Sequence, residues 1–300
     1  MRTMVEKVFV ATFSLTSGLM AAAGPAAAYE SAYYESYQSE IAALSLTVPG
    51  AQIGVHLGDV SNIAVGGGKV YFQEGVDIYS ANPDLSGVTL FRHNGAAPTD
   101  IAVDAAAGVF YESFAGSELA ALSLANPGTQ IGVHLGDATN ITVGGGKVYF
   151  QDGLDIDVAN SNLSGLTLYR HNGAAPTDIA VDASVGVFYE SFAGSELAAL
   201  SLADPTTQLA VYLGNATNLA VGGGKVYFQD GANIVSAYPS LVGLTLLHAN
   251  AGQPTDFAVD SHFALPPPVP EPSTYALMII GVLALAGIHS SRLRSRWGWG

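Results

Sequence analysis

Residues 99–137 read TDIAVDAAAGVFYESFAGSELAALSLANPGTQIGVHLGD, and residues 177–215 read TDIAVDASVGVFYESFAGSELAALSLADPTTQLAVYLGN, so nearly the same segment returns after 78 residues. A weaker relative, TNITVGGGKVYFQDGLDIDVANSNLSGLTLYRHNGAAP at 139–176, lies between them and recurs at 61–98 and 217–254. The true unit is therefore about half of this spacing. Repeats of roughly 40 residues are typical of solenoids and of propeller blades.

Each unit is built around an inner apolar tripeptide, and these tripeptides are separated by steps of 38, 40, 38, 40 and 38 residues. They begin at Ile63, Ile101, Ile141, Ile179, Leu219 and Phe257. Within one unit we find four short apolar or alternating runs, at 101–103, 109–114, 119–124 and 130–135. A helical repeat is the competing interpretation, but β-branched and aromatic runs bounded by glycine favour strands. Four strands per unit predict a propeller blade.

The two ends of the repeat array complement each other. Residues 34–40, YESYQSE, match YESFAGSE at 111–118 with one residue missing, so the array begins at the second strand of a blade. Residues 255–260, TDFAVD, match TDIAVD at 99–104 and supply a first strand with no strands after it. Pairing the two fragments removes open sheet edges. The sequence therefore predicts an all-β, six-bladed β-propeller over 29–264, closed by a composite blade from both ends.

The repeat phrases also resemble known propellers. The segment ANSNLSG at 159–165, the following LTLY, PTDIAVD at 176–182 and GVFY at 186–189 are similar to the YWTD and NHL families of six-bladed propellers. The Trp of the YWTD signature is absent from these segments. The resemblance implies the fold rather than an activity, since such propellers host both enzymes and binding proteins.

The composition is that of an acidic, turn-rich β protein. Residues 29–268 contain 23 of the 25 acidic residues and five basic ones, which gives 5 − 23 = −18. Such a surface repels nucleic-acid phosphates and anionic lipid, so we expect no nucleic-acid partner. The chain has no Cys, which excludes disulfides, thiolate metal sites and a Cys nucleophile.

The N-terminal segment has the features of a secretory signal. Arg2 and Lys7 precede an apolar run at 8–23, and small residues follow it. We expect residues 1–28 to be a signal peptide cut between Ala28 and Tyr29. A retained membrane helix is the alternative, but the run is interrupted by polar residues.

The C-terminal segment has the order of a proline spacer, a short motif, an apolar span and a basic tail. Residues 265–270 form a proline-rich linker, and an apolar run extends from Tyr275 to Ile288. That run has 14 residues, or 18 when it is extended to 273–290, against the roughly 20 residues that a membrane helix needs. The tail contains Arg292, Arg294 and Arg296. Because positive residues stay inside, we expect a short transmembrane helix with a cytoplasmic tail and an exported propeller.

This arrangement resembles a PEP-CTERM sorting signal. The motif that carries the resemblance is Val269, Pro270, Glu271 and Pro272, and the sorting segment with its apolar span and basic tail is assigned to 271–300. The resemblance implies recognition by an exosortase, a membrane protease-transpeptidase of bacteria that make exopolysaccharide. It therefore implies a chain anchored transiently at the inner membrane and then delivered to the cell surface or extracellular matrix, with extracellular polysaccharide as a further expected partner.

One recurring set of polar residues could line the channel of the propeller. Each inner tripeptide follows an Asx residue, and three tripeptides are also followed by Asp. The leading residues are Asn62, Asp100, Asn140, Asp178, Asn218 and Asp256, and the following ones are Asp104, Asp182 and Asp260. Oxygen ligands in a ring could bind a cation such as Ca²⁺ weakly. The alternative is that these side chains accept hydrogen bonds from the local backbone. We assign no metal site and no required cofactor.

No catalytic motif is found. His56 and His134 occupy one repeated position, His93, His171 and His248 another, and the Gly-Gly-Gly of 66–68 recurs as a strand turn rather than a phosphate-binding loop. Near-identical repeats leave little that is unique to one blade, whereas catalysis needs an asymmetric site. We therefore predict no catalytic residues and a non-catalytic binding or scaffold protein of the cell surface or exopolysaccharide matrix. The alternative is a periplasmic lactonase- or hydrolase-like propeller enzyme with a metal in the channel.

Overall fold

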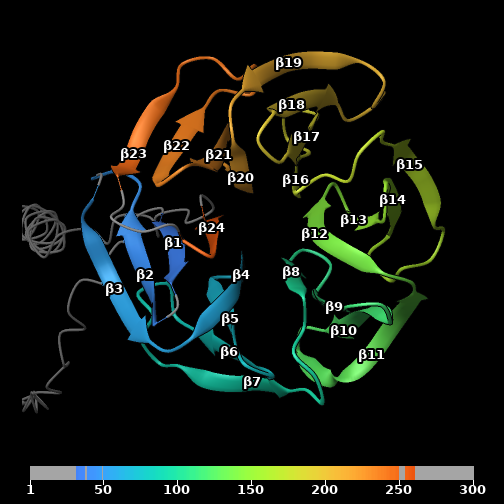
Figure 1. Ribbon diagram of the computed structural model, residues 1–300. Coiled ribbons are helices and arrows are strands. Elements are labelled where there is room, and N and C mark those ends of the chain that lie inside the picture. The colour runs from blue at the N-terminus through green and yellow to red at the C-terminus, as the bar shows by residue number, and fades with distance from the viewer. Residues whose placement is uncertain (1–31, 38, 49, 250–253, 261–300) are drawn as a thin grey trace, which may run out of the picture. The chain divides into compact units, whose positions relative to one another are not determined.

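The computed structural model describes residues 32–37, 39–48, 50–249 and 254–260. Over these residues the chain forms 24 strands in six four-stranded antiparallel sheets, which surround a central channel (Figure 1). The predicted six-bladed propeller is thereby confirmed. The predicted signal peptide, linker, sorting motif and membrane span lie outside the described residues.

The blades are of two kinds, which alternate around the ring. Three of them, here called Asp-type blades, have an inner strand that begins with Asp. Their strands are β24 (Asp256–Asp260), β1 (Ala32–Tyr37), β2 (Glu40–Ser45) and β3 (Gln52–Leu57); β8 (Asp100–Asp104), β9 (Val109–Phe114), β10 (Glu118–Ser123) and β11 (Asn126–Leu135); and β16 (Asp178–Asp182), β17 (Val187–Phe192), β18 (Glu196–Ser201) and β19 (Gln208–Leu213).

The other three, here called Asn-type blades, contain an Asn in the inner strand. Their strands are β4 (Val60–Gly66), β5 (Lys69–Glu74), β6 (Asp77–Ala81) and β7 (Thr89–His93); β12 (Ala138–Gly144), β13 (Lys147–Asp152), β14 (Asp155–Asn160) and β15 (Thr167–His171); and β20 (Ala216–Gly222), β21 (Lys225–Asp230), β22 (Asn233–Ala237) and β23 (Thr245–Ala249).

The composite blade closes the ring as predicted. Strand β24 pairs antiparallel with β1, with Ser36 opposite Asp256 and Ala32 opposite Asp260. The same register joins β8 to β9, where Asp100 lies opposite Ser113. Thr255 adds a backbone hydrogen bond of 2.9 Å to the carbonyl of Ser36. The two ends of the array thus make a blade equivalent to an uninterrupted one.

The core consists of six apolar clusters, each between two adjacent blades. Strand β9 shows how one strand serves two clusters, because Phe110 packs toward β5 while Tyr111 packs toward β13. Side chains of a strand point alternately to opposite faces, and both faces of a blade are covered. This explains why the middle strands of the blades are apolar at consecutive positions, whereas the outer strands alternate.

Each Asn-type blade places a leucine in the core from a left-handed backbone. Leu85, Leu163 and Leu241 have φ values of 59°, 61° and 56°, and all three are buried. A left-handed residue with a Cβ costs roughly 1–2 kcal/mol. Burying a leucine contributes about 1.5–3 kcal/mol, which offsets that cost.

Candidate functional site: the central channel and the blade joints

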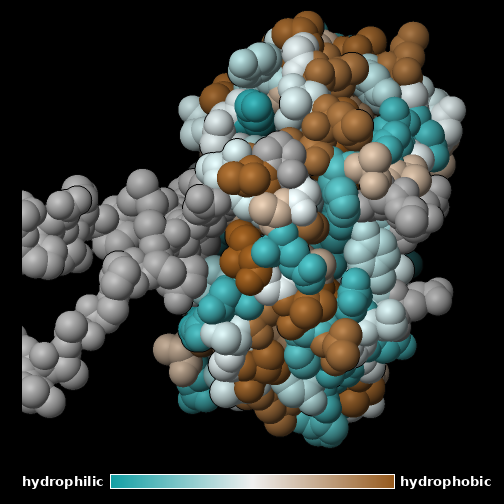
Figure 2. Space-filling model, turned by 90° about the vertical axis from the view of Figure 1, so that its left-hand side faces the viewer, coloured by the Kyte–Doolittle hydropathy of each residue, from teal (hydrophilic) through white to brown (hydrophobic). Residues whose placement is uncertain are grey.

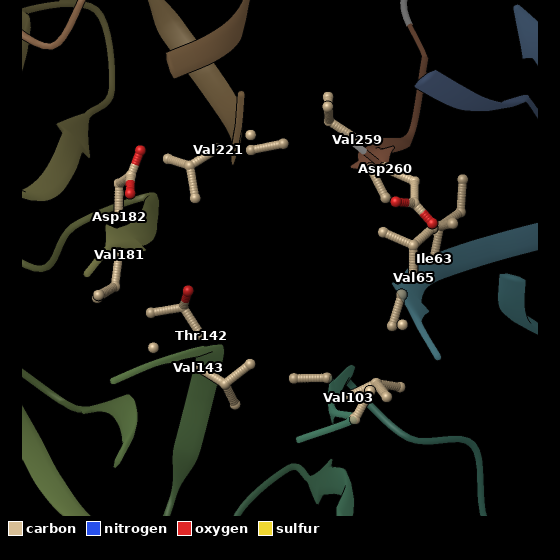
Figure 3. Close-up of a pocket in the computed structure, with 18 of the residues that line it drawn as sticks. Ile63, Val65, Val103, Thr142, Val143, Val181, Asp182, Val221, Val259 and Asp260 are labelled. Atoms are coloured by element: carbon tan, nitrogen blue, oxygen red, sulfur yellow. The ribbon is translucent and has the colours of Figure 1, made fainter. Parts of the chain in front are cut away.

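The channel runs between the six inner strands and has a volume of about 800 Å³. Valine side chains from these strands surround its open centre (Figure 3). Gly66 allows the inner strands to approach one another, because a Cβ at this position would lie 2.7 Å from a Val103 methyl group. Gly67 and Gly68 have φ values of 62° and 72° and form the β4–β5 turn, as the sequence predicted. The channel wall is therefore chiefly aliphatic side chains and backbone.

The three leading Asp residues link adjacent blades near one end of the channel. One oxygen of Asp100 accepts a hydrogen bond from the N–H of Ile101 in its own strand, at 2.7 Å. Its other oxygen accepts from the N–H of Ile141 in the next blade, at 2.5 Å. Asp178 makes the equivalent bonds to Ile179 and Leu219. The predicted local backbone bond is therefore present, and the bond between blades is an addition that the sequence did not indicate.

Asp256 makes the same link where the ring closes. It accepts a hydrogen bond of 2.8 Å from the N–H of Phe257 and one of 2.7 Å from the N–H of Ile63 in β4. The N-terminal and C-terminal parts of the array are thus joined by this carboxylate as well as by the β24–β1 ladder. Three of the six blade joints contain an Asp–backbone link of this kind.

These three carboxyl groups titrate well above the ordinary range of Asp. Burial raises the pKa of Asp100 to about 6 and that of Asp178 to about 7, although the accepted backbone hydrogen bonds work in the opposite direction. Burial, followed by the charge of Asp100, raises the pKa of Asp256 well above 3.8. The three residues are only partly exposed. They are near enough to one another to share charge repulsion, so ionising all three is unfavourable.

This linkage predicts an unusual dependence of stability on pH. Because the folded-state pKa values are raised, the stabilisation is complete below the unfolded pKa near 3.8 and is lost as the pH rises through about 6 to 7. We expect the free energy of unfolding to fall by an amount on the order of 3 kcal/mol between about pH 4 and pH 8, after a discount for the partial exposure of these side chains. Urea unfolding at several pH values measures this fall.

The triple variant Asp100→Asn, Asp178→Asn, Asp256→Asn should lose most of this slope. The matched control is Asp104→Asn, Asp182→Asn, Asp260→Asn at the other end of the inner strands. An unchanged slope in the first variant would show that other groups cause the pH dependence.

The second set of predicted channel carboxylates binds to nearby turns. Asp104 accepts hydrogen bonds from the N–H of Ala107 at 2.9 Å and from the hydroxyl of Ser161 at 3.2 Å. Asp182 accepts from the N–H and hydroxyl of Ser184 at 3.0 and 2.5 Å. Asp182 and Asp260 both line the channel (Figure 3). In the part of the chain that the structure describes, no group of three or more His, Asp or Glu is arranged to bind a metal.

The Asn residues of the other blades have a different role. Asn140 and Asn218 adopt left-handed backbones, with φ values of 46° and 49°, at register shifts in β12 and β20. Asn tolerates this conformation better than most residues. The side chain of Asn140 donates to Gln151 at 2.7 Å, and Asn62 and Asn218 donate likewise to Gln73 and Gln229. The Asx positions therefore form two structural sets rather than one uniform ring.

The described His residues each lie near a single carboxylate. His56 lies 2.7 Å from Glu74, and the equivalent Tyr212 donates to Asp230 at 2.7 Å. His93 and His171 each lie 2.5 Å from an Asp of the neighbouring strand. Equivalent His residues thus stay on separate blades, as the repeat spacing indicated.

Buried glutamates at three further joints were not singled out from the sequence. Glu112, whose side chain is fully buried, forms an ion pair of 2.9 Å with Nε of Arg92 in the preceding blade and accepts a hydrogen bond of 2.9 Å from Asn94. Arg170 and Glu190 repeat this ion pair at 3.1 Å. Where the ring closes, His248 takes the place of the arginine and lies 3.1 Å from Glu35. The prediction that His248 is equivalent to His93 and His171 is therefore wrong, because Ala249 occupies their register position in β23. The 78-residue recurrence of Arg-His-Asn and Tyr-Glu-Ser was the available signal.

Burial is the main cause that raises the pKa of Glu112 and of Glu190, and the nearby arginine partly offsets it. These ion pairs are therefore structural links between blades. Together with the Asp links they place a polar contact at every one of the six joints.

Within the described ranges, no helix is long and apolar enough to cross a membrane. The predicted cleavage position at Ala28 and Tyr29, the motif at 269–272, the span from Tyr275 to Ile288 and the arginine tail all lie outside those ranges.

Comparison with known proteins supports the fold. No protein-family model and no curated protein matches the sequence. Among solved structures, a chain of the nidogen–laminin complex is similar with a TM-score of 0.64 and 14% sequence identity, over 76% of this chain and 98% of that one. The computationally designed protein Ika8 aligns with a TM-score of 0.49 and 10% identity, over 74% of each chain. The first of these likenesses shows a shared propeller fold.

Proposed function

We propose that this chain is an exported, non-catalytic propeller that binds or spaces components of the cell surface or of an exopolysaccharide matrix. The regularity of the ring supports the proposal that this protein is non-catalytic. The inner-strand Asp residues recur on alternate blades and are used in blade joints, as for Asp100, Asp178 and Asp256. A catalytic site needs a singular constellation with a free nucleophile or base, and the repeats supply equivalent, engaged groups instead.

The proposed destination is supported by the two ends of the sequence. The segment Val269–Pro270–Glu271–Pro272 precedes an apolar run and three arginines, and an N-terminal signal-like segment precedes the propeller. A proline-rich stretch at 265–270 separates the repeat array from this motif in the sequence. An exosortase-type protease-transpeptidase is the proposed processing partner, and the apolar run is the proposed transient anchor.

Mass spectrometry of the mature protein tests this proposal. In cells that contain an exosortase, we expect the wild-type chain to lose residues 275–300, whereas the variant Glu271→Ala, Pro272→Ala should retain them and stay with the membrane. The matched control is Pro266→Ala, Pro267→Ala in the linker, which leaves the motif intact. Retention of residues 275–300 by the wild type to the same extent as by the motif variant would make this segment a permanent anchor. Polymer that co-purifies with the released wild type would identify the matrix component.

A further inference from the structure

The outer strands of the three Asp-type blades present an unusual edge. Strands β3, β11 and β19 each lie at the end of their sheet, so their outward backbone groups face away from the ring. They are spread around its perimeter (Figure 1). Alternate side chains of these strands are exposed and aliphatic, as in Ile53, Val55 and Leu57 of β3. The terminal leucines Leu57, Leu135 and Leu213 are 75%, 76% and 77% exposed.

The opposite face of β3 and of β11 packs closely against the next blade, and β19 has Ala210 at the equivalent position. A Cβ at Gly54 would lie 2.0 Å from the carbonyl oxygen of Asp84 in the next blade, and His56 is bound to Glu74. A Cβ at Gly132 would lie 2.1 Å from the carbonyl oxygen of Asn162. The aliphatic rows therefore cannot turn inward, because the register would bring larger side chains against the neighbouring backbone. Exposure of these rows is built into the fold.

These edges carry a β-bulge against their inner neighbours, but they carry no charged side chain. Exposed edge strands are commonly blunted by Lys or other charges. None of the three strands contains Asp, Glu, Lys or Arg, although the chain has a formal net charge of −15. Figure 2 shows hydrophobic patches on the side of the ring that carries β3 and β23. The uncharged edges are thus places where two acidic molecules can touch without placing like charges opposite each other.

We propose that these edges pair with the same edges of further copies of this chain. Antiparallel pairing about a two-fold axis is self-complementary, because it places Val55 opposite the equivalent valine and Ile53 opposite Leu57 of the other copy. The partner therefore needs no other surface than the one described. Three such edges on one ring make each molecule trivalent, so that pairing extends into a layer rather than ending at a dimer.

Because the surface is acidic, this association should depend on ionic strength. Long-range repulsion between two anionic rings opposes contact at low ionic strength and is screened by salt. Backbone pairing and aliphatic burial do not weaken with moderate salt. Association should therefore increase as salt is added, which is the opposite of an assembly held by ion pairs. The inference adds to the scaffold role of the proposed function and rests on that proposal only for its biological use.

Sedimentation and light scattering of the full-length chain test the inference. Over a roughly hundredfold range of protein concentration, we expect the mass-average molar mass to rise at least about twofold, and more so at higher salt. The triple variant Leu57→Lys, Leu135→Lys, Leu213→Lys should stay monomeric with an unchanged melting temperature. A variant with only two edges blocked, Leu135→Lys, Leu213→Lys, should stop at the dimer.

The matched control is Leu90→Lys, Leu168→Lys, Leu246→Lys on β7, β15 and β23. These leucines are 56%, 59% and 56% exposed, and the change in net charge is the same. This control should still assemble. A monomeric wild type at every concentration, or equal loss in both triple variants, would overturn the inference and leave the sorting proposal untouched. Binding of an added strand-forming peptide to a monomeric wild type would identify a different occupant and would also overturn it.

Discussion

A chain that ends at Pro254 should lose cooperative folding, because it lacks the strand that closes the ring. Strand β24 supplies the inner strand of the composite blade and buries Phe257 and Val259, which are 3% and 7% exposed. Burial of two such side chains is worth roughly 5 kcal/mol. The hydrogen bond from Ile63 to Asp256 and the ladder to β1 are lost as well. Since domains are stable by only about 5–15 kcal/mol, the loss is comparable to the whole stability.

Circular dichroism during heating and size-exclusion chromatography measure the effect. We expect a broad transition or none, and aggregation through the exposed edge of β1. The control chain ends at Leu265, which retains β24 and removes the same C-terminal segment beyond it. A second variant, Asp256→Ala in the complete chain, should keep the fold and lower stability by about 1–3 kcal/mol, because the N–H of Ile63 loses its acceptor. A sharp wild-type transition in the shorter chain would mean that the ring does not depend on the composite blade.

The variant Arg92→Met should produce the second large effect. It removes the cation from the fully buried Glu112 while leaving a side chain of similar length. Breaking a buried ion pair on one side costs about 3–5 kcal/mol, because the remaining charge is uncompensated. Burial already raises the pKa of Glu112, and loss of the arginine should raise it further. The destabilisation should therefore be greatest above neutral pH and should shrink on acidification, as the carboxyl group takes up a proton.

Urea unfolding of four proteins resolves the contribution of this pair. They are the wild type, Arg92→Met, Glu112→Gln and the double variant, which together form a double-mutant cycle. We expect the double variant to recover much of the stability lost in Arg92→Met. Arg170→Met provides the matched comparison, since Arg170 and Glu190 repeat the contact one repeat later. If Arg92→Met were as stable as the wild type at pH 8, the ion pair would not hold the two blades together.

The sequence alone determined the repeat, the number of blades and the closure. These features are visible along the chain because each blade repeats the same strand and turn signals. The match of residues 34–40 to 111–118, and of 255–260 to 99–104, located the composite blade in the register that β1 and β24 adopt. The alternation of exposed and partly buried side chains along the outer strands was also predictable from the sequence, since one face of each strand is solvated.

Only the tertiary structure decided what the repeated polar residues do. The second oxygen of Asp100 reaches Ile141 across a blade joint, and Arg92 reaches Glu112 across the preceding joint of the ring. Local rules account for the bond from Asp100 to its own strand, but a contact between blades depends on how two sheets pack. The raised pKa values of the three Asp residues depend on burial and, for Asp178 and Asp256, on the charge of the other Asp residues. Spacing in the sequence indicates that residues are equivalent, and only packing brings equivalent residues together.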